Sequence, residues 1–503
     1  MSEELMTDKN QNITSSDNKG KLGIIALIAV VVCSMLGGGV FSLPQNSAVS
    51  SAVGPVIIAW IIAGIGIYFI ANSFRLLSDL RPDLNAGVYM YAQEGFGSFV
   101  GFNVAWGYWL MTCLGNVAFA VLLMDAFDDF FPGVFTGGNN LTSIICGSIL
   151  IWGYNFLVLS GIRVASKINV IGTIAVLVPL TLFILILGVS IDYVMFSSNI
   201  WGTDPQIMTQ SHHQTVPVTL LAQIVAPITI ALWSFIGVEG AVVLSGRAKK
   251  KSDVGKATLI GFIAALVIYI LISVLPFGVM TQAQLSVLPN PSIAGVLGYV
   301  VGNWGDWLMN VGLIISILTG WLAWTMLCAE IPMVAGEKGA FPKAFAKKNK
   351  NESATVSLWV SSGVMQAAML LVYFSDDAWV AMYSISALMV VPAYFAATLY
   401  MAKICYKNQY AQFNHQSNTG KTLAMCSGVF GAIFCIFILY ASEFKYVALI
   451  PFLLTLGLPV YIWSRKEKHD GKPIFEQHEK LYLAILLLLD VIVVFLLFMT
   501  DLF

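Results

Sequence analysis

The sequence predicts an all-α integral membrane protein, and three observations carry this prediction. The chain of 503 residues is 58% hydrophobic but only 11% charged, whereas a soluble domain has about 25% charged residues. It contains thirteen apolar segments of about the 20 residues that a helix needs to cross a bilayer. Lys and Arg collect in alternate connections between these segments, as the positive-inside rule expects of a protein with many spans.

The spans are assigned as helices from their length, because a span buried among others lacks a polar face that would reveal its period. The thirteen segments lie near 22–45, 52–74, 97–124, 142–160, 168–189, 217–245, 257–280, 303–333, 354–374, 378–402, 422–441, 445–464 and 481–500. The longest polar connections are too short for soluble domains and lie at 190–216, 281–302, 334–353 and 403–421. The chain is therefore predicted to form one membrane domain.

The distribution of charge predicts the orientation in the membrane. If the N-terminus lies in the cytoplasm, all of the 26 Lys and Arg except Lys445 fall on the cytoplasmic side. After thirteen spans the C-terminus then lies outside. The polar residues 1–20 are expected to form a disordered cytoplasmic tail.

Composition and motifs exclude several classes of function. The net charge of −1 excludes a broad nucleic-acid surface, so we expect no nucleic-acid partner. The sequence has no P-loop, dinucleotide-binding glycine fingerprint or nucleophile elbow at a plausible strand–helix junction, and we predict no catalytic residue and no cofactor. The seven cysteines lack metal-ligand spacing, so we expect neither a metal site nor a disulfide. A channel would need charged rings along a pore, and none is evident.

The first span contains a break. Three consecutive glycines, Gly37 to Gly39, interrupt it, and each costs a helix about 1 kcal/mol relative to alanine. Within a bilayer a broken helix survives only where it is buried in protein or lines a water-filled cavity. The half-helix after the break directs unpaired N–H groups into that cavity, where they attract an anion such as a carboxylate. The alternative is that the glycines only allow close helix packing.

This break has a counterpart 200 residues later in the chain. Ser34–Gly37 in the first span resembles Ser234–Gly237 in the sixth, which crosses the membrane in the opposite direction. Paired broken helices in inverted repeats form the substrate sites of many secondary transporters. We therefore predict a first repeat of five spans at 21–189, a second at 217–405 and additional spans at 422–503.

Four side chains within the spans are candidates for a site. Trp233 at the second break offers an aromatic face to a cation. Glu239 is ionisable at membrane depth, which by default indicates gating or cation coupling; a protonated or paired carboxyl that bridges helices is the alternative. Asn116 in the third span either contacts a substrate or bonds a neighbouring helix. Trp324 in the eighth span lies deeper than an interfacial tryptophan, so we place it in a cavity wall.

Five segments spread over the first ten spans resemble a known family, namely GGGVFSLPQN (Gly37–Asn46), DLRPDLNAGVYMYAQEGFG (Asp79–Gly97), WGYWLMTCLGNVAFA (Trp106–Ala120), ALWSFIGVEGAVVLSGRAKKKSDVGKAT (Ala231–Thr258) and AEIPMVAGEKGAFPKAFAKKNK (Ala329–Lys350). Through them the chain resembles the amino acid–polyamine–organocation transporters. Within that superfamily it most resembles the bacterial basic amino acid antiporters of the arginine/ornithine branch. The segments are much less specific about the substrate than about the group.

The resemblance implies a leucine-transporter-like fold with two inverted five-helix repeats plus three C-terminal helices, in the bacterial inner membrane. It implies antiport by alternating access, without enzyme chemistry. The implied substrate contacts are the amides of Gly38 and Gly39 for the carboxylate, the carbonyls of Met35, Trp233 and Ile236 for the ammonium group, and Met111, Thr112, Asn116 and Trp324 for a cationic side chain. The implied gate contains Tyr108 and Glu239, with Trp233 closing over the ligand.

We expect exchange of arginine for its catabolic product ornithine. Two alternatives stay open: exchange of histidine for histamine, or of another amino acid for its decarboxylation product, and proton-coupled uptake with Glu239 titrating. Relatives that exchange arginine for agmatine carry a hydroxyl residue at the position of Gly38. They also carry a gate tyrosine directly after the proline, where Ala393 follows Pro392 and precedes Tyr394. The expected partners are these small molecules and membrane lipid, and the sequence is compatible with a homodimer.

Overall fold

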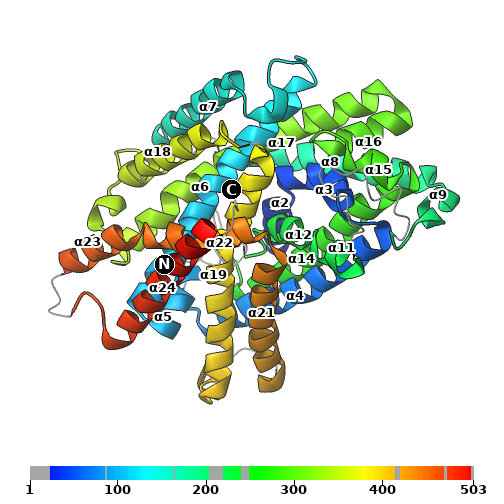
Figure 1. Cartoon of the computed structure of the whole chain (residues 1–503). Helices are drawn as coiled ribbons and strands as arrows, with labels where there is room; N and C mark the ends of the chain where they lie inside the picture. Colours follow the sequence, from blue (N-terminus) through cyan, green and yellow to red (C-terminus); the bar gives the residue numbers. More distant parts are fainter. Residues whose placement is uncertain are drawn as a thin grey trace, which may run out of the picture.

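The computed structural model describes residues 23–84, 88–161, 165–202, 219–239, 249–375, 377–413, 420–468 and 473–499. Helices dominate this part of the chain (Figure 1), and its only strand pairing is an isolated β-bridge between Lys348 and Ala354. The predicted all-α fold is therefore confirmed. The predicted tail at 1–20 lies outside the described residues.

The helices and 3-10 turns follow one another through short connections. Their bounds are α2 (Ile24–Met35), η1 (Gly38–Ser42), α3 (Leu43–Ala48), α4 (Val53–Leu80), α5 (Val88–Phe96), α6 (Ser98–Asp128), η2 (Thr136–Gly138), α7 (Leu141–Leu159), α8 (Ala165–Ser190), α9 (Tyr193–Ser198), α11 (Leu220–Val225), α12 (Ile228–Phe235), α14 (Lys251–Val274), η5 (Leu275–Gly278), α15 (Gln282–Ser286), α16 (Ser292–Val301), α17 (Asn303–Glu337), η6 (Lys343–Ala346), α18 (Thr355–Val372), α19 (Ala378–Tyr406), α20 (Tyr410–Phe413), α21 (Lys421–Ala441), α22 (Phe444–Thr455), α23 (Leu458–Lys468) and α24 (Gln477–Met499). Figure 1 shows α19 beside α21, and α7 beside α18 at one flank of the bundle.

Nine helical segments of the described part are long and apolar enough to cross a membrane. They match nine of the predicted spans and comprise α4, α6, α7, α14, α17, α18, α19, α21, and α22 together with α23. The other four predicted spans are also helical over their described residues. Two of them are α8 and α24, and the remaining two are the first and sixth spans, which are divided into shorter helices.

Two helices form the centre of the bundle. In the most apolar stretch of 18 residues, 89% of α6 and 78% of α19 is buried, compared with only 33% of α7. A helix surrounded by others has no polar side, which explains why these two spans show no amphipathic pattern in the sequence. Side chains on α6 and α19 therefore face other helices rather than lipid.

The predicted breaks are present in both helices. α2 ends at Met35, the 3-10 turn η1 begins at Gly38, and α3 begins at Leu43. α12 ends at Phe235, and Gly237 then has a φ of +105°. Only glycine adopts that conformation without steric cost, so the sequence terminates this helix at a defined residue.

The two breaks pack directly against each other. The hydroxyl of Ser34 donates to the carbonyl of Gly237 at 2.8 Å, and a Cβ added at Gly237 would lie 2.6 Å from the Ser34 carbonyl oxygen. Tyr269 of α14 directs its hydroxyl at the carbonyls of Met35 and Ser234, at 2.7 and 2.6 Å. Carbonyls released by unwinding thus find partners within the protein, which a membrane environment requires.

One connection differs from the sequence prediction. The segment 281–302, expected to be a polar connection, contains α15 and α16, and α16 packs against α17 and α3. Its apolar run is shorter than a span, so a criterion based on spanning length does not detect it. The predicted span at 445–464 is present as one apolar segment that contains α22 and α23 with a turn between them. There Gly457 lies against Trp106, whose indole nitrogen donates to the carbonyl of Leu453 at 2.8 Å.

Candidate functional site

One face of α6 lies against both breaks. Tyr108, Thr112, Asn116 and Phe119 follow one another at intervals of three or four residues, which places them on one side of the helix. A Cβ added at Gly37 in the first break would lie 3.6 Å from the Phe119 ring. Tyr108, at the other end of this stripe, hydrogen-bonds to a residue of the second break. The stripe therefore forms one wall of the candidate site.

The first break presents its glycines to a tryptophan of the second. Gly38 and Gly39 are the buried first residues of η1, and the first N–H groups of a helix have no acceptor within it. A Cβ added at Gly39 would lie 2.4 Å from Nε1 of Trp233, so the indole covers this glycine directly. The structure thus brings Trp233 next to the first break, as the resemblance implied. Binding of a substrate carboxylate by the amides of Gly38 and Gly39 stays a prediction.

Aromatic rings occupy the space between the breaks and α6. The ring centroid of Trp233 lies 5.8 Å from that of Trp324 and 6.1 Å from that of Phe119. Phe119 and Trp324 are 5.2 Å apart. Trp379 and Tyr383 of α19 extend the cluster, at 6.5 and 6.4 Å from Trp233. Trp324 therefore lies beside Trp233 of the second break and against α6, where an aromatic face can receive a cation.

The three predicted contacts on α6 differ in how far their polar atoms are already engaged. The carbonyl of Met111 accepts a hydrogen bond from Ser386 at 2.8 Å, and the hydroxyl of Thr112 donates to the carbonyl of Trp109 at 2.7 Å. Oδ1 of Asn116 is buried and has no hydrogen-bond partner among the described residues. Asn116 is therefore the member of this group that offers an open acceptor.

Two of the three carbonyls predicted to receive an ammonium group, those of Met35 and Trp233, accept hydrogen bonds within the protein. That of Met35 accepts from the Gly37 amide at 2.7 Å in addition to Tyr269, and that of Trp233 accepts from the Ile236 amide at 3.2 Å. Because a carbonyl oxygen has two lone pairs, Trp233 can accept a second bond, whereas a ligand would compete at Met35. The roles of Met35, Trp233 and Ile236 stay predictions.

Glu239 is held between two tyrosines. Its carboxylate accepts from the hydroxyl of Tyr108 at 2.6 Å and from that of Tyr394 at 2.8 Å, and the Gly237 amide approaches to 3.3 Å. The side chain is only 1% exposed. These contacts join α6, α19 and the second break, so Glu239 bridges helices as one sequence interpretation proposed. Its role with Tyr108 in gating stays a prediction.

Three residues of this site were not identified as contacts from the sequence. Tyr269 connects the two breaks, Phe119 contacts both tryptophans, and Tyr394 bonds the buried carboxylate. A lone tyrosine in the apolar run of the seventh span was the available signal for Tyr269. Tyr394 was visible only as a departure from the expected position of a gate tyrosine.

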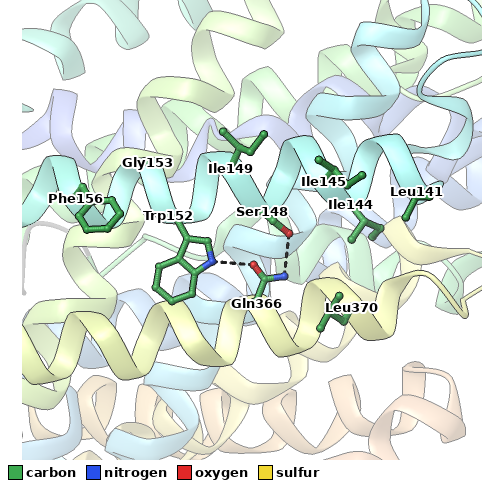
Figure 2. Close-up of a pocket in the computed structure, with 10 residues that line it drawn as sticks. All are labelled: Leu141, Ile144, Ile145, Ser148, Ile149, Trp152, Gly153, Phe156, Gln366 and Leu370. Carbon is green, nitrogen blue, oxygen red and sulfur yellow. Dashed lines mark hydrogen bonds between the residues drawn. The ribbon is translucent and has the colours of Figure 1, made fainter.

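A separate groove of about 670 Å³ lies between α7 and α18 (Figure 2). Its lining is apolar apart from a chain in which Trp152 donates to Gln366 at 3.0 Å and Gln366 donates to Ser148 at 2.9 Å. None of the predicted site residues lines it. Its residues belong to two spans at the flank of the bundle, so the groove is distinct from the candidate site.

Comparisons with known proteins agree with the fold. The sequence model of a family described as amino acid permease matches residues 22–451. A protein named arginine/agmatine antiporter from Chlamydia abortus is 47% identical over 485 residues, which cover 96% of this chain and 98% of the relative. A protein of the same name from Chlamydia pneumoniae has the same identity and coverage. One from Chlamydia trachomatis serovar D is 45% identical over 475 residues, covering 94% of this chain and 96% of the relative.

Proposed function

Because this chain belongs to the amino acid permease family, we propose that it is an antiporter that takes up arginine in exchange for agmatine. Membership of the family makes the chain a membrane transporter of leucine-transporter-like fold and not an enzyme, and its bacterial relatives are consistent with a cell membrane. The observation that carries the substrate proposal is the 47% identity, over nearly the whole chain, to relatives named arginine/agmatine antiporter.

The geometry of the site suits an elongated ligand with a cation at one end. The amides of Gly38 and Gly39 would receive the arginine carboxylate, and the Trp233 indole, which covers Gly39, would have to move to admit it. The guanidinium group would donate to the open Oδ1 of Asn116 and lie against the ring of Trp324. Binding both ends of arginine would order it between the breaks and α6.

Exchange of arginine for ornithine is the second candidate. It is the exchange that the sequence resemblance favoured, because that resemblance implies a hydroxyl residue at the position of Gly38 and a gate tyrosine at that of Ala393 in exchangers of arginine for agmatine. Ornithine retains the carboxylate that the first break would bind, whereas agmatine lacks it. The counter-substrate therefore decides whether the first break binds only one of the exchanged molecules or both.

Charge separates the two candidates. Near pH 7 arginine and ornithine each carry one net positive charge, whereas agmatine carries two because both its amine and its guanidinium group stay protonated. One-for-one exchange of arginine for agmatine moves one positive charge outward in each cycle. Exchange for ornithine is electroneutral.

The deciding experiment is counterflow in proteoliposomes loaded with agmatine, ornithine, histamine or buffer, with labelled arginine or histidine outside. We expect fast arginine uptake against internal agmatine, and further acceleration when valinomycin and potassium clamp the membrane potential. Equal uptake into buffer-loaded vesicles would exclude exchange. Uptake that responds only to internal ornithine and ignores the clamp would establish the second candidate, and histidine entry only against histamine would replace both.

Alternating access would use the pair of broken helices. We propose that the repeats at 21–189 and 217–405 carry one break each. The support is the contact of Ser34 with Gly237 and the common hydrogen bond of both breaks to Tyr269. An exchanger must change between its outward-open and inward-open conformations far more readily with ligand bound than empty. The ligand must therefore favour the occluded conformation over the open ones. The cytoplasmic N-terminus stays a prediction.

A further inference from the structure

A glycine in the middle of α6 lies directly against the two tryptophans of the candidate site. A Cβ added at Gly115 would lie 2.4 Å from Cζ3 and 3.0 Å from Cε3 of Trp324, and 3.1 Å from Cη2 of Trp233. Carbon atoms in favourable contact are about 3.5–4.0 Å apart, so no side chain fits between the helix and these rings. Both rings therefore rest on the backbone of α6 at Gly115.

The surroundings of Gly115 differ from those of a glycine that serves helix packing. Glycine inside a helix costs about 0.5–1 kcal/mol relative to alanine, so its presence calls for a reason. At Gly107 on the same helix, a Cβ would lie 3.2 Å from the backbone carbonyl oxygen of Met389 on α19, as expected where small residues let two helices approach closely. At Gly115 the three nearest atoms all belong to the tryptophan rings. This glycine thus accommodates side chains of the site rather than a neighbouring backbone.

The Trp233 indole lies between two glycines that come from different elements. A Cβ added at Gly39 in the first break would lie 2.4 Å from Nε1 of this ring, and one added at Gly115 on α6 would lie 3.1 Å from its Cη2. The rings of Phe119 and Trp324 border the indole as well, with centroids 6.1 and 5.8 Å away. A methyl group at Gly115 would therefore push the rings away from α6, and the first break lies on that side.

We propose that Gly115 is a specificity-determining residue, which sets how long a cationic side chain the site accepts. This inference rests on the proposed function, in which the substrate carboxylate lies at Gly38 and Gly39 and the cation lies against Trp324. The space between these two ends depends on how closely the rings approach α6. A ring atom 2.4 Å from the added carbon must move by about 1 Å to reach a normal contact. The shortened site would then favour a shorter side chain.

The experiment compares arginine with two homologues that carry the same guanidinium group. One has one methylene fewer, and the other, homoarginine, has one more. Each competes with labelled arginine for uptake into proteoliposomes loaded with the counter-substrate that supports exchange. Because the charged groups are identical, the ratios of the inhibition constants report on length. In Gly115→Ala we expect the preference for arginine over the shorter homologue to fall about tenfold, at the lower end of what one methylene contributes to discrimination in a pocket.

Two further variants test the same contact from the other side and control for crowding. Trp324→Phe removes the part of the indole that lies nearest to Gly115 and so lengthens the site. Homoarginine is therefore expected to gain about tenfold relative to arginine. Gly107→Ala adds the same methyl group to α6 at a position that faces Met389 instead of the tryptophans. It is the matched control and is expected to leave both ratios unchanged.

The outcomes separate this inference from the function on which it depends. If the wild-type protein does not exchange arginine, the proposed function is wrong. If it does, and a folded Gly115→Ala variant keeps the wild-type preference, the role in length selection is wrong, whatever the thermal midpoint of the variant. If Gly115→Ala does not fold, Trp324→Phe decides, and an unchanged ratio of homoarginine to arginine overturns the inference. Equal changes in Gly107→Ala would also overturn it, because crowding anywhere on α6 would then alter selectivity.

Discussion

The glycine run at the first break allows a graded test of what its three residues do. The spacing pattern alone treats Gly37, Gly38 and Gly39 alike, but their surroundings differ. A Cβ added at Gly37 would lie 3.6 Å from Phe119, which is an ordinary contact, and one at Gly38 would lie 3.0 Å from a side-chain carbon of Ile317. At Gly39 the same atom would lie 2.4 Å from Nε1 of Trp233.

These distances determine how much each substitution to alanine is expected to destabilise the protein. Gly39→Ala forces the Trp233 indole to move by about 1 Å to reach a normal separation. Its neighbours Trp324 and Phe119 lie close on other sides, so the ring cannot simply retreat. Overpacking of this kind costs about 1–3 kcal/mol, which corresponds to roughly a 5- to 150-fold loss in an equilibrium or rate.

The other two substitutions are expected to be milder. At Gly38 the Ile317 side chain must yield by only a few tenths of an ångström, so we expect Gly38→Ala to cost less than about 1 kcal/mol. Gly37 has a φ of −81°, which alanine adopts freely. Gly37→Ala is therefore expected to be neutral or to stabilise by about 0.4–1 kcal/mol, because it reduces the entropy of the unfolded chain.

The assay is counterflow of labelled arginine together with the thermal midpoint of each variant in detergent. The expected order of damage is Gly39→Ala, then Gly38→Ala, then Gly37→Ala. Trp233→Phe, which shortens the ring, is expected to restore part of the thermal midpoint lost in Gly39→Ala, as contacting residues couple in a double-mutant cycle. Equal damage at all three positions would refute the reasoning, since it would show that backbone freedom rather than space beneath Trp233 is what the glycines supply.

Three further substitutions test separate parts of the site. Trp324→Ala is expected to weaken arginine binding about tenfold through loss of a cation–π contact while the protein stays folded; unchanged affinity by calorimetry would remove this residue from the pocket. Glu239→Gln is expected to slow exchange while arginine affinity stays within about threefold, and normal exchange across the pH range would make Glu239 purely structural. Tyr269→Phe leaves two buried carbonyls with fewer donors, at a cost of about 1–3 kcal/mol, so its thermal midpoint is expected to fall; an unchanged midpoint would mean that the hydroxyl does not hold the breaks.

The sequence was informative where the signal is local. Gly37 to Gly39 interrupt a helix by their intrinsic propensity, so the break could be predicted without knowing its neighbours. Glu239 could be identified because an ionisable residue within a span is rare and costly. In both cases the structure then showed which side chains surround the residue. Trp233 covers Gly39, and two tyrosines donate hydrogen bonds to Glu239.

Contacts between distant spans could not be predicted in the same way. Tyr269 and Met35 are 234 residues apart in the chain, and Asn116 and Cys328 are 212 apart. Tyrosine and cysteine are common in apolar cores, so neither residue type marks a site by itself. Their contacts follow only from which helices pack together, and that packing is decided by shape along whole faces rather than by any short motif.

The same packing indicates which parts of the site move together. The two breaks are joined by Ser34 to Gly237 and by the hydroxyl of Tyr269. The Trp233 ring, in contrast, packs against Phe119 and Gly115 of α6 and against Trp324 of α17. Hydrogen bonds are directional and are lost steeply with displacement, but ring contacts tolerate sliding between several arrangements. A ligand that enters between the breaks and α6 would therefore displace the Trp233 ring first and leave the paired breaks intact.

Glu239 is the exception, because its bond to Tyr108 ties the second break to α6. Opening of the site on that side requires this bond to break or α6 to follow, which is why Glu239 is the residue where binding and transport are expected to separate.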